Sequence, residues 1–125
     1  MRILICGDRN WTDTDFVHLI LEGAYEQSRQ AGEPFTLIEG CAPGADRAAC
    51  HWRSKRFDIQ HLHFPADWKR YGYSAGPIRN RQMVQEGKPD VVYAFHDDLA
   101  GSRGTIDMLK VAKKEKIPVI LCSHG

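Results

Sequence analysis

The sequence predicts a single α/β domain with a three-layer architecture, in which helices cover both faces of a mostly parallel sheet of five strands. Short apolar segments alternate with longer, helix-like segments along the whole chain. Strands that alternate with helices favour a parallel sheet covered by helices on both faces. A chain of 125 residues also has the length of one domain, so the expected domain covers residues 1–125.

Five short apolar segments have the character of buried strands. The first ends at Gly7, the second ends at Gly40, and the third alternates two histidines with other residues. The expected strands are Ile3–Cys6, Phe35–Glu39, Ile59–Phe64, Val91–Phe95 and Pro118–Cys122.

Four longer segments carry apolar residues at helical spacing. Thr12 and Asp13 offer N-caps for the first, which Gly32 stops, and Gly87 ends the third. The expected helices extend from Asp13 to Gly32 and over Ala45–Arg56, Ile78–Glu86 and Thr105–Lys116. The two long connections Pro65–Pro77 and His96–Gly104 are expected to be loops.

The composition argues against several classes of protein. The 17 basic and 16 acidic residues give a formal net charge of +1, which argues against a general nucleic-acid partner. With 42% hydrophobic and 26% charged residues the chain is expected to be globular. No apolar run approaches the roughly 20 residues of a membrane-spanning helix, and the first residues predict a strand instead of a signal peptide. We therefore expect a soluble, cytoplasmic protein with no membrane partner.

The cysteine and histidine patterns predict no metal site, and we expect no cofactor. No C-x-x-C pair is present, so the cysteines are expected to be small apolar side chains in a reducing compartment. They are Cys6, Cys41, Cys50 and Cys122. His61 and His63 alternate along a strand, a spacing that can chelate a metal but more often places histidines in a core or at a sheet edge.

Three glycine-containing turns follow expected strands and predict a ligand site. They are Gly7–Asn10, Gly40–Asp46 and Gly101–Thr105. In parallel sheets ligands bind beyond the carboxyl ends of the strands, where the strand order reverses. A single turn of this kind usually only ends a strand, but helix N-termini beside glycine turns bind phosphate through free N–H groups. The G-x-G-x-x-G, P-loop and G-x-S-x-G motifs are absent from the sequence.

Side chains near these turns suit a phosphorylated nucleotide. Arg79 and Arg81 flank Asn80, and an arginine fork can bind phosphate in a bidentate manner. Asn80 can recognise a base or ribose edge, and Arg9 is placed to complete a phosphate site. Asp46 can hold a ribose hydroxyl or act as a partner of the helix dipole. The expected ligand-binding residues are Gly7, Arg9, Gly40, Gly44, Ala45, Asp46, Arg79, Asn80, Gly101, Gly104 and Thr105.

Two further side chains have expected roles near the ligand. The Thr105 hydroxyl can donate a hydrogen bond to phosphate at the start of the last helix. Trp68 can stack on a base, or it can pack its loop onto the sheet.

Four motifs in a fixed order carry a resemblance to a known family. They are Gly40-x-x-x-Gly44-Ala45-Asp46, the run Pro65–Trp68, the run Ala75-Gly76-Pro77-Ile78-Arg79-Asn80-Arg81-x-Met83, and the run Gly104–Met108. Together they resemble the SLOG superfamily (SMF/DprA–LOG), and within it the small, stand-alone YspA-like, cpYpsA-related branch. The resemblance implies a Rossmann-like fold that binds nucleotides or nucleotide-derived ligands, and a two-fold homodimer.

The resemblance also implies two different activities among relatives. LOG enzymes hydrolyse the N-glycosidic bond of nucleoside monophosphates, and other relatives are associated with sensing NAD- or ADP-ribose-like signals. The LOG motif P-G-G-x-G-T-x-x-E ends in a catalytic glutamate, and aligning Gly104-Thr105 places Met108 at that position. A methionine exchanges no proton, and Asp107 is rotated by about 100° from it along a helix.

These observations leave three functions open. Met108 favours a binding module that acts as sensor, carrier or sequestering protein for a nucleotide-derived small molecule. The alternative is a LOG-like nucleoside 5'-monophosphate phosphoribohydrolase that uses a relocated acid, Asp107 or Asp46. A weaker alternative is single-stranded nucleic-acid binding, because aromatic and basic residues mix in Trp68–Tyr73.

Overall fold

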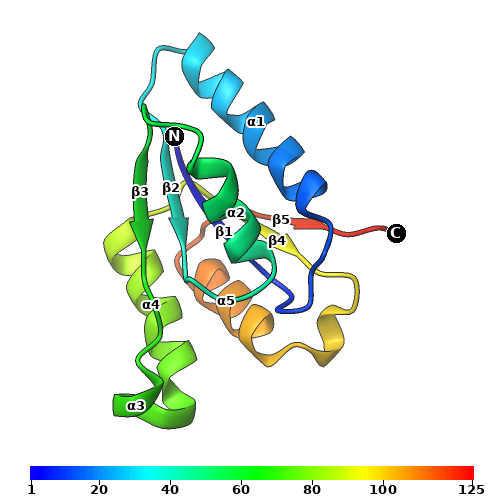
Figure 1. Ribbon diagram of the computed structural model, residues 1–125. Helices are drawn as coiled ribbons and strands as arrows, with labels where there is room; N and C mark the ends of the chain where they lie inside the picture. The colour runs from blue at the N-terminus through cyan, green and yellow to red at the C-terminus, as the bar shows by residue number, and fades with distance from the viewer.

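The sheet consists of five parallel strands in the order β3-β2-β1-β4-β5. The computed structural model describes residues 1–125, and Figure 1 shows its helices and strands. The strands are β1 (Arg2–Gly7), β2 (Thr36–Glu39), β3 (Gln60–His63), β4 (Val91–Phe95) and β5 (Val119–Cys122). The α/β fold with a parallel five-stranded sheet is therefore confirmed.

Five α-helices and two short 3₁₀ helices connect the strands. The α-helices are α1 (Thr14–Gln30), α2 (Ala45–Arg53), α3 (Trp68–Tyr71), α4 (Ala75–Gly87) and α5 (Arg103–Lys114). The 3₁₀ helices are η1 (Gly72–Ser74) and η2 (Leu99–Gly101). None of the helices has the length and apolar character needed to cross a bilayer.

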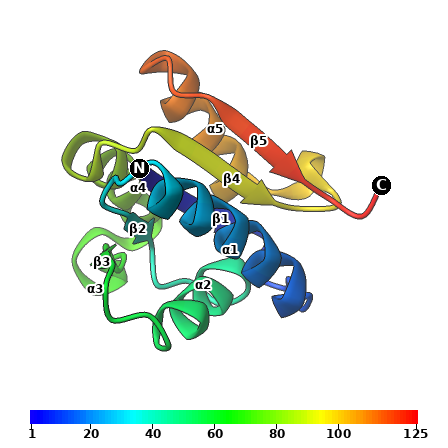
Figure 2. The same ribbon diagram turned by 90° about the horizontal axis from the view of Figure 1, so that it is seen from above.

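Strand β1 is buried on both faces, as expected for the centre of a parallel sheet. Ile3 and Ile5 belong to a core that includes the inner residues of α1 and α2. Leu4 and Cys6 point the other way, into a second core with residues of α4 and α5. The two helix pairs therefore cover opposite faces of the sheet, and Figure 2 shows this layering from above.

The strand order reverses between β1 and β4. These two strands are neighbours, with Gly7 paired to Phe95 at their carboxyl ends. Helix α1 leaves β1 toward one face of the sheet, whereas α5 leaves β4 toward the other. This switch point is where open α/β sheets bind ligands.

The segment expected to be a loop before the third long helix is partly helical. It contains α3 and η1, and α4 begins at Ala75 instead of Ile78. Pro77 is the third residue of α4, a position where the missing proline N–H has no helical partner to lose. The loop prediction for Pro65–Pro77 is therefore wrong over this stretch.

The ends of two other helices differ from those expected. Helix α5 begins at Arg103, two residues early, because the Ser102 hydroxyl oxygen caps it by accepting a hydrogen bond from the Thr105 N–H at 3.3 Å. Helix α2 ends at Arg53, before the expected Arg56. The expected loop after β4 also contains the short helix η2.

Candidate functional site

The loops after β1, β2 and β4 all lie at the carboxyl edge of the sheet. Each of the helices α1, α2, α4 and α5 begins at this edge (Figure 1). The expected ligand-binding residues come from these loops and from the first turns of these helices. The fold therefore places them along one edge, as the sequence predicts.

Gly44 places the start of α2 against the loop that follows β1. Its φ is 85°, and a side chain there would collide with the carbonyl oxygen of Asp8 and the backbone of Arg9. A residue without Cβ is therefore required at this close approach. Gly44 brings the first turn of α2 beside Arg9, which is exposed at the same edge.

The first turn of α2 carries N–H groups that have no hydrogen-bond partner. No side chain caps this helix, and its first backbone bond is donated by the Ala48 N–H to the Gly44 carbonyl at 3.0 Å. The N–H groups of Ala45, Asp46 and Arg47 are the ones that a helix start leaves unpaired. They give this end of α2 the partial positive charge that attracts anions.

Arg79 of α4 holds the loop that begins at Gly40. Its Nη1 donates a 2.6 Å hydrogen bond to the Gly40 carbonyl, and its Nε donates to Asn80 Oδ1 at 3.1 Å. A side chain at position 40 would collide with this guanidinium, so glycine is needed there too. The remaining nitrogen, Nη2, makes no hydrogen bond within the chain. Arg79 thus positions the loop through Nε and Nη1, and its Nη2 group remains free to donate to a ligand.

Asn80 links α4 to the start of α5. It is buried, and its Nδ2 donates to Asp107 Oδ2 at 2.9 Å and to the Gly104 carbonyl at 3.3 Å. Both of its amide hydrogens are used inside the protein. Asp107, the acid considered as a replacement for the LOG glutamate, is therefore a direct partner of Asn80.

Met108 does not face the carboxyl edge. Only 1% of its surface is exposed, and it packs in the core with Leu4, Cys6 and Met83. Thr105, Met108 and Ala112 form the buried stripe of α5, at the three- and four-residue spacing of a helix face. The residue that the motif alignment places at the LOG glutamate is therefore a core side chain in this fold.

Asp46 is buried and organises the β2–α2 loop. Its Oδ2 accepts hydrogen bonds from the Gly40 N–H at 2.7 Å and from the Ala42 N–H at 3.5 Å. Burial raises the pKa of this carboxyl to about 7, although the hydrogen bond from Gly40 opposes the shift. Asp46 lies in the first turn of α2, where it is also a favourable dipole partner.

The remaining expected residues differ in their exposure. Ala45 and Thr105 are buried, whereas Gly101 and Gly104 are exposed at the end of η2 and the start of α5. Trp68 is 50% exposed and its ring lies beside Gly76 at the start of α4. It joins none of the hydrogen bonds described above.

Sequence reasoning missed a cluster around Glu39, the last residue of β2. Glu39 is completely buried, and its Oε1 lies 3.0 Å from His61 Nε2 on the neighbouring strand β3. Burial alone would raise the pKa of Glu39, but hydrogen bonds from His61 and from the Cys41 N–H lower it. The His-x-His spacing of β3 was the signal in the sequence.

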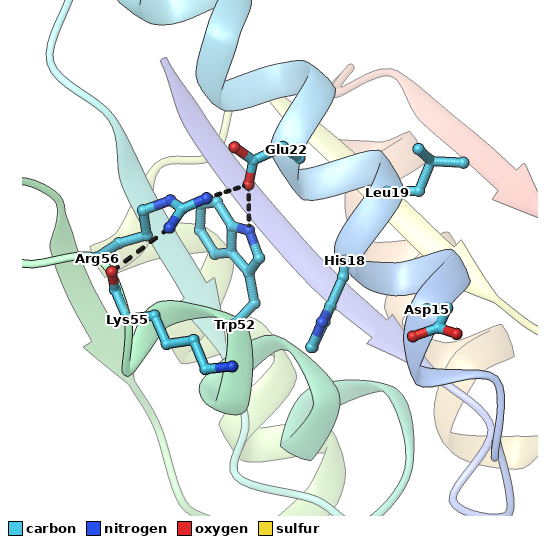
Figure 3. A pocket seen from close by; sticks show the side chains of 7 residues that line it. All are labelled: Asp15, His18, Leu19, Glu22, Trp52, Lys55 and Arg56. Carbon is cyan, nitrogen blue, oxygen red and sulfur yellow. Dashed lines mark hydrogen bonds and ion pairs between the residues drawn. The ribbon is translucent and has the colours of Figure 1, made fainter.

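Two surface hollows lie apart from the carboxyl edge of the sheet, where the expected ligand-binding residues gather. The first, of about 430 Å³, lies between α1 and α2, where Trp52 Nε1 donates to Glu22 at 2.8 Å (Figure 3). It is lined by Asp15, His18, Leu19, Glu22, Trp52, Lys55 and Arg56. The second, of about 470 Å³, lies where α5 leads into β5. Neither contains an expected ligand-binding residue.

Comparison with known proteins confirms the resemblance. The family model described as "YspA, cpYpsA-related SLOG family" matches residues 1–71. The Gene 61 protein of Mycobacterium phage D29 is 36% identical over 123 residues, which cover 95% of this chain and 94% of that protein. No solved structure matches the chain. The chain belongs to the YspA, cpYpsA-related SLOG family.

Proposed function

We propose that this protein binds a nucleotide-derived, phosphorylated small molecule, such as a nucleoside monophosphate or an ADP-ribose-like compound. SLOG family membership suggests a nucleotide-related binding or modifying role. The proposed site is the carboxyl edge formed by the ends of β1, β2 and β4. With such a site the protein acts as a sensor, carrier or sequestering module.

The start of α2 is the observation that carries the proposal. Its first turn has no side-chain cap, and the absence of a Cβ at Gly44 lets this turn lie close to the backbone of Arg9. Unpaired N–H groups at a helix start bind phosphate through hydrogen bonds and the helix dipole. The position of this turn at a sheet edge, beside the strand-order reversal, is the usual place for a nucleotide.

Two arginines support a phosphate at this position. Arg9 is exposed beside the first turn of α2. Arg79 retains an unused Nη2 next to Gly40, at the beginning of the same loop. Charge-assisted hydrogen bonds from guanidinium groups are among the strongest that a protein can offer to phosphate.

Hydrolysis of an N-glycosidic bond is the second candidate function, and Asp107 is the observation that favours it. Its carboxylate is half-buried at the start of α5 and is oriented by Asn80. Glycosidic hydrolysis needs a carboxylate that activates water or stabilises positive charge at the anomeric carbon. Binding without turnover remains our conclusion, because Met108, which aligns with the catalytic glutamate of the LOG motif, lies in the core and supplies no carboxylate to the carboxyl edge.

Native mass spectrometry combined with chromatography tests both functions. We expect a complex of one AMP or one ADP-ribose per chain, and no free adenine after incubation. A protein that forms neither complex would contradict the proposal. Release of adenine that is lost in Asp107→Asn would instead establish the hydrolase, since this variant keeps the shape of the side chain and removes its negative charge.

A further inference from the structure

Five side chains of metal-ligand type converge at the outer end of the sheet, around one buried carboxylate. They are Glu39, Cys41, Cys50, His61 and His63. They come from four parts of the fold: β2, the loop after it, α2 and β3. No two of them have the C-x-x-C spacing of a zinc motif, so only the fold brings them together.

The strand register explains why the side chains meet. Glu39 pairs with His63 across the parallel strands β2 and β3, so their side chains lie on the same face. His61 lies two residues before His63 and therefore shares that face. Leu37, the register partner of His61, belongs to the core beneath α2. Cys50 reaches the same place from α2.

The ligand atoms form two groups that share Glu39, and within each group all of them lie within 4.8 Å of one another. Glu39 Oε1 lies 3.0 Å from His61 Nε2, and Cys50 Sγ lies 4.0 Å from the same nitrogen. On the solvent-exposed side of the cluster, Glu39 Oε1 lies 3.7 Å from Cys41 Sγ and 3.8 Å from His63 Nδ1. Tetrahedral zinc with bonds of about 2.0–2.3 Å separates its ligand atoms by about 3.3–3.8 Å.

We propose that Glu39, Cys50 and His61 bind a zinc ion, and that the exposed side chain of Cys41 or His63, which lies with Glu39 in the second group, moves toward the ion to supply the fourth ligand. A set of sulfur, imidazole nitrogen and carboxylate ligands suits zinc, whereas magnesium and calcium prefer oxygen alone. The Glu39 side chain is fully buried and that of His61 is 17% exposed, while His63 is 63% exposed. The inner ligands are thus preformed, and the ion has access from the side of Cys41 and His63.

The proposed ion would tie strand β3 to the β2–α2 loop. Glu39 immediately precedes Gly40, and Cys41 lies in the loop with a φ of 60°, a conformation that few residues other than glycine adopt. This inference goes beyond nucleotide binding and does not depend on it. It also departs from the expectation that the cysteines are only apolar side chains.

Metal content and cobalt spectroscopy test the site directly. Untagged, reduced protein is loaded with Zn²⁺, freed of excess metal by gel filtration, and analysed for zinc; we expect one zinc per chain and a raised Tm. Replacement by Co²⁺ should give the intense visible absorption of a tetrahedral site and a thiolate-to-cobalt charge-transfer band. A wild-type protein that retains no zinc and gives neither band would overturn the proposal.

Matched variants identify the ligands. Loss of a residue that only contacts a metal ligand typically weakens metal binding by about 10–100-fold. Cys50→Ser and His61→Gln remove ligands themselves, so each should weaken Zn²⁺ binding by more than that. Their controls are Cys122→Ser, far from the cluster, and His51→Gln, whose exposed ring stacks on His18; both should bind zinc like the wild type. Equal affinity in the ligand variants and the controls would overturn the assignment.

Two exposed substitutions test the fourth position without threatening the fold. Cys41 and His63 are both exposed, so Cys41→Ser and His63→Gln should fold normally, as checked by circular dichroism. We expect one or both of these variants to bind Zn²⁺ about tenfold more weakly than the wild type, or weaker still. Wild-type affinity in both would show that the proposed four-ligand arrangement is wrong.

Discussion

Asn80 Nδ2 donates a 2.9 Å hydrogen bond to the carboxylate of Asp107, and this bond joins α4 to the start of α5. The same side chain accepts a hydrogen bond from Arg79, whose guanidinium holds the Gly40 carbonyl at the end of β2. The Arg79-Asn80 pair therefore connects the β2–α2 loop with the first turn of α5. Its main action is to fix the two turns that flank the proposed site.

The connection through Asn80 predicts a loss of stability in Asn80→Ala. This variant leaves the Asp107 carboxylate, the Gly104 carbonyl and the Arg79 Nε without their partner. We expect a decrease of about 1–3 kcal/mol in the free energy of unfolding, measured with urea. Asn10→Ala is the matched control, because Asn10 is exposed and its side chain makes no hydrogen bond. Equal stability of the two variants would contradict the connecting role.

Gly44→Ala tests the close approach between α2 and the loop after β1. Gly32 provides the control: it also has a positive φ, of 67°, but a Cβ added there would have no atom within 4 Å. Gly32→Ala should cost about 1–2 kcal/mol from backbone strain alone. Gly44→Ala should cost about 1–3 kcal/mol more because of its collision with Asp8 and Arg9, and it should also weaken nucleotide binding. Equal losses in the two variants would show that the contact is loose.

Most of the fold could be predicted from the sequence, because its signals are local. The apolar run Val91–Phe95 predicts β4 at its observed bounds, and the alternation of strands and helices predicts the layers. The start of α4 could not be predicted in the same way, because Pro77 indicates a loop unless it lies in the first turn of a helix. The amino-acid sequence by itself does not show that a helix begins directly after Ser74.

The site could be predicted only as a set of turns at one edge. Which face of α5 packs on the sheet decides that Met108 is buried and that Asp107 reaches Asn80, and a motif alignment carries no such information. The buried spacing of Thr105, Met108 and Ala112 was the available signal. The cluster around Glu39 depends on strand register and on a helix 11 residues away in sequence, at Cys50, so it emerges only in the fold.

The raised pKa of Asp46 predicts a pH dependence of stability. In the folded state the carboxyl keeps its proton up to about pH 7, whereas in the unfolded chain its pKa returns to the ordinary value of 3.8. Between these values the folded state binds more protons, so this group's contribution to stability falls as the pH rises, by at most about 1.4 kcal/mol per pH unit.

Asp46→Asn isolates that contribution, because it removes the titrating group and keeps an oxygen for the Gly40 N–H. Urea unfolding of wild type and variant at several pH values from about 4 to about 7 should show the wild type losing stability relative to the variant as the pH increases. A constant difference between the two proteins over this range would mean that the pKa of Asp46 is not raised.

The edge strand β5 predicts self-association. Val119, Ile120 and Leu121 are 36%, 45% and 49% exposed, an unusual row of apolar side chains on a strand with one unpaired edge. We expect a two-fold homodimer that covers this strand. Light scattering at tens of micromolar protein should give twice the mass of the chain, and Ile120→Lys should give the mass of one chain. A wild-type monomer would remove this prediction.

Titration calorimetry of AMP and ADP-ribose against the wild type, Arg9→Ala and Arg29→Ala is the most direct test of a nucleotide site at the carboxyl edge. Arg9 lies at that edge, whereas Arg29 is also exposed but lies in the last turn of α1, and both variants lower the net charge by one. We predict that Arg9→Ala weakens binding by about 1.5–3 kcal/mol, roughly tenfold to a hundredfold, as expected for a charge-assisted hydrogen bond. Arg29→Ala should bind like the wild type. Absence of binding to the wild type, or equal affinities in the two variants, would contradict the proposed site.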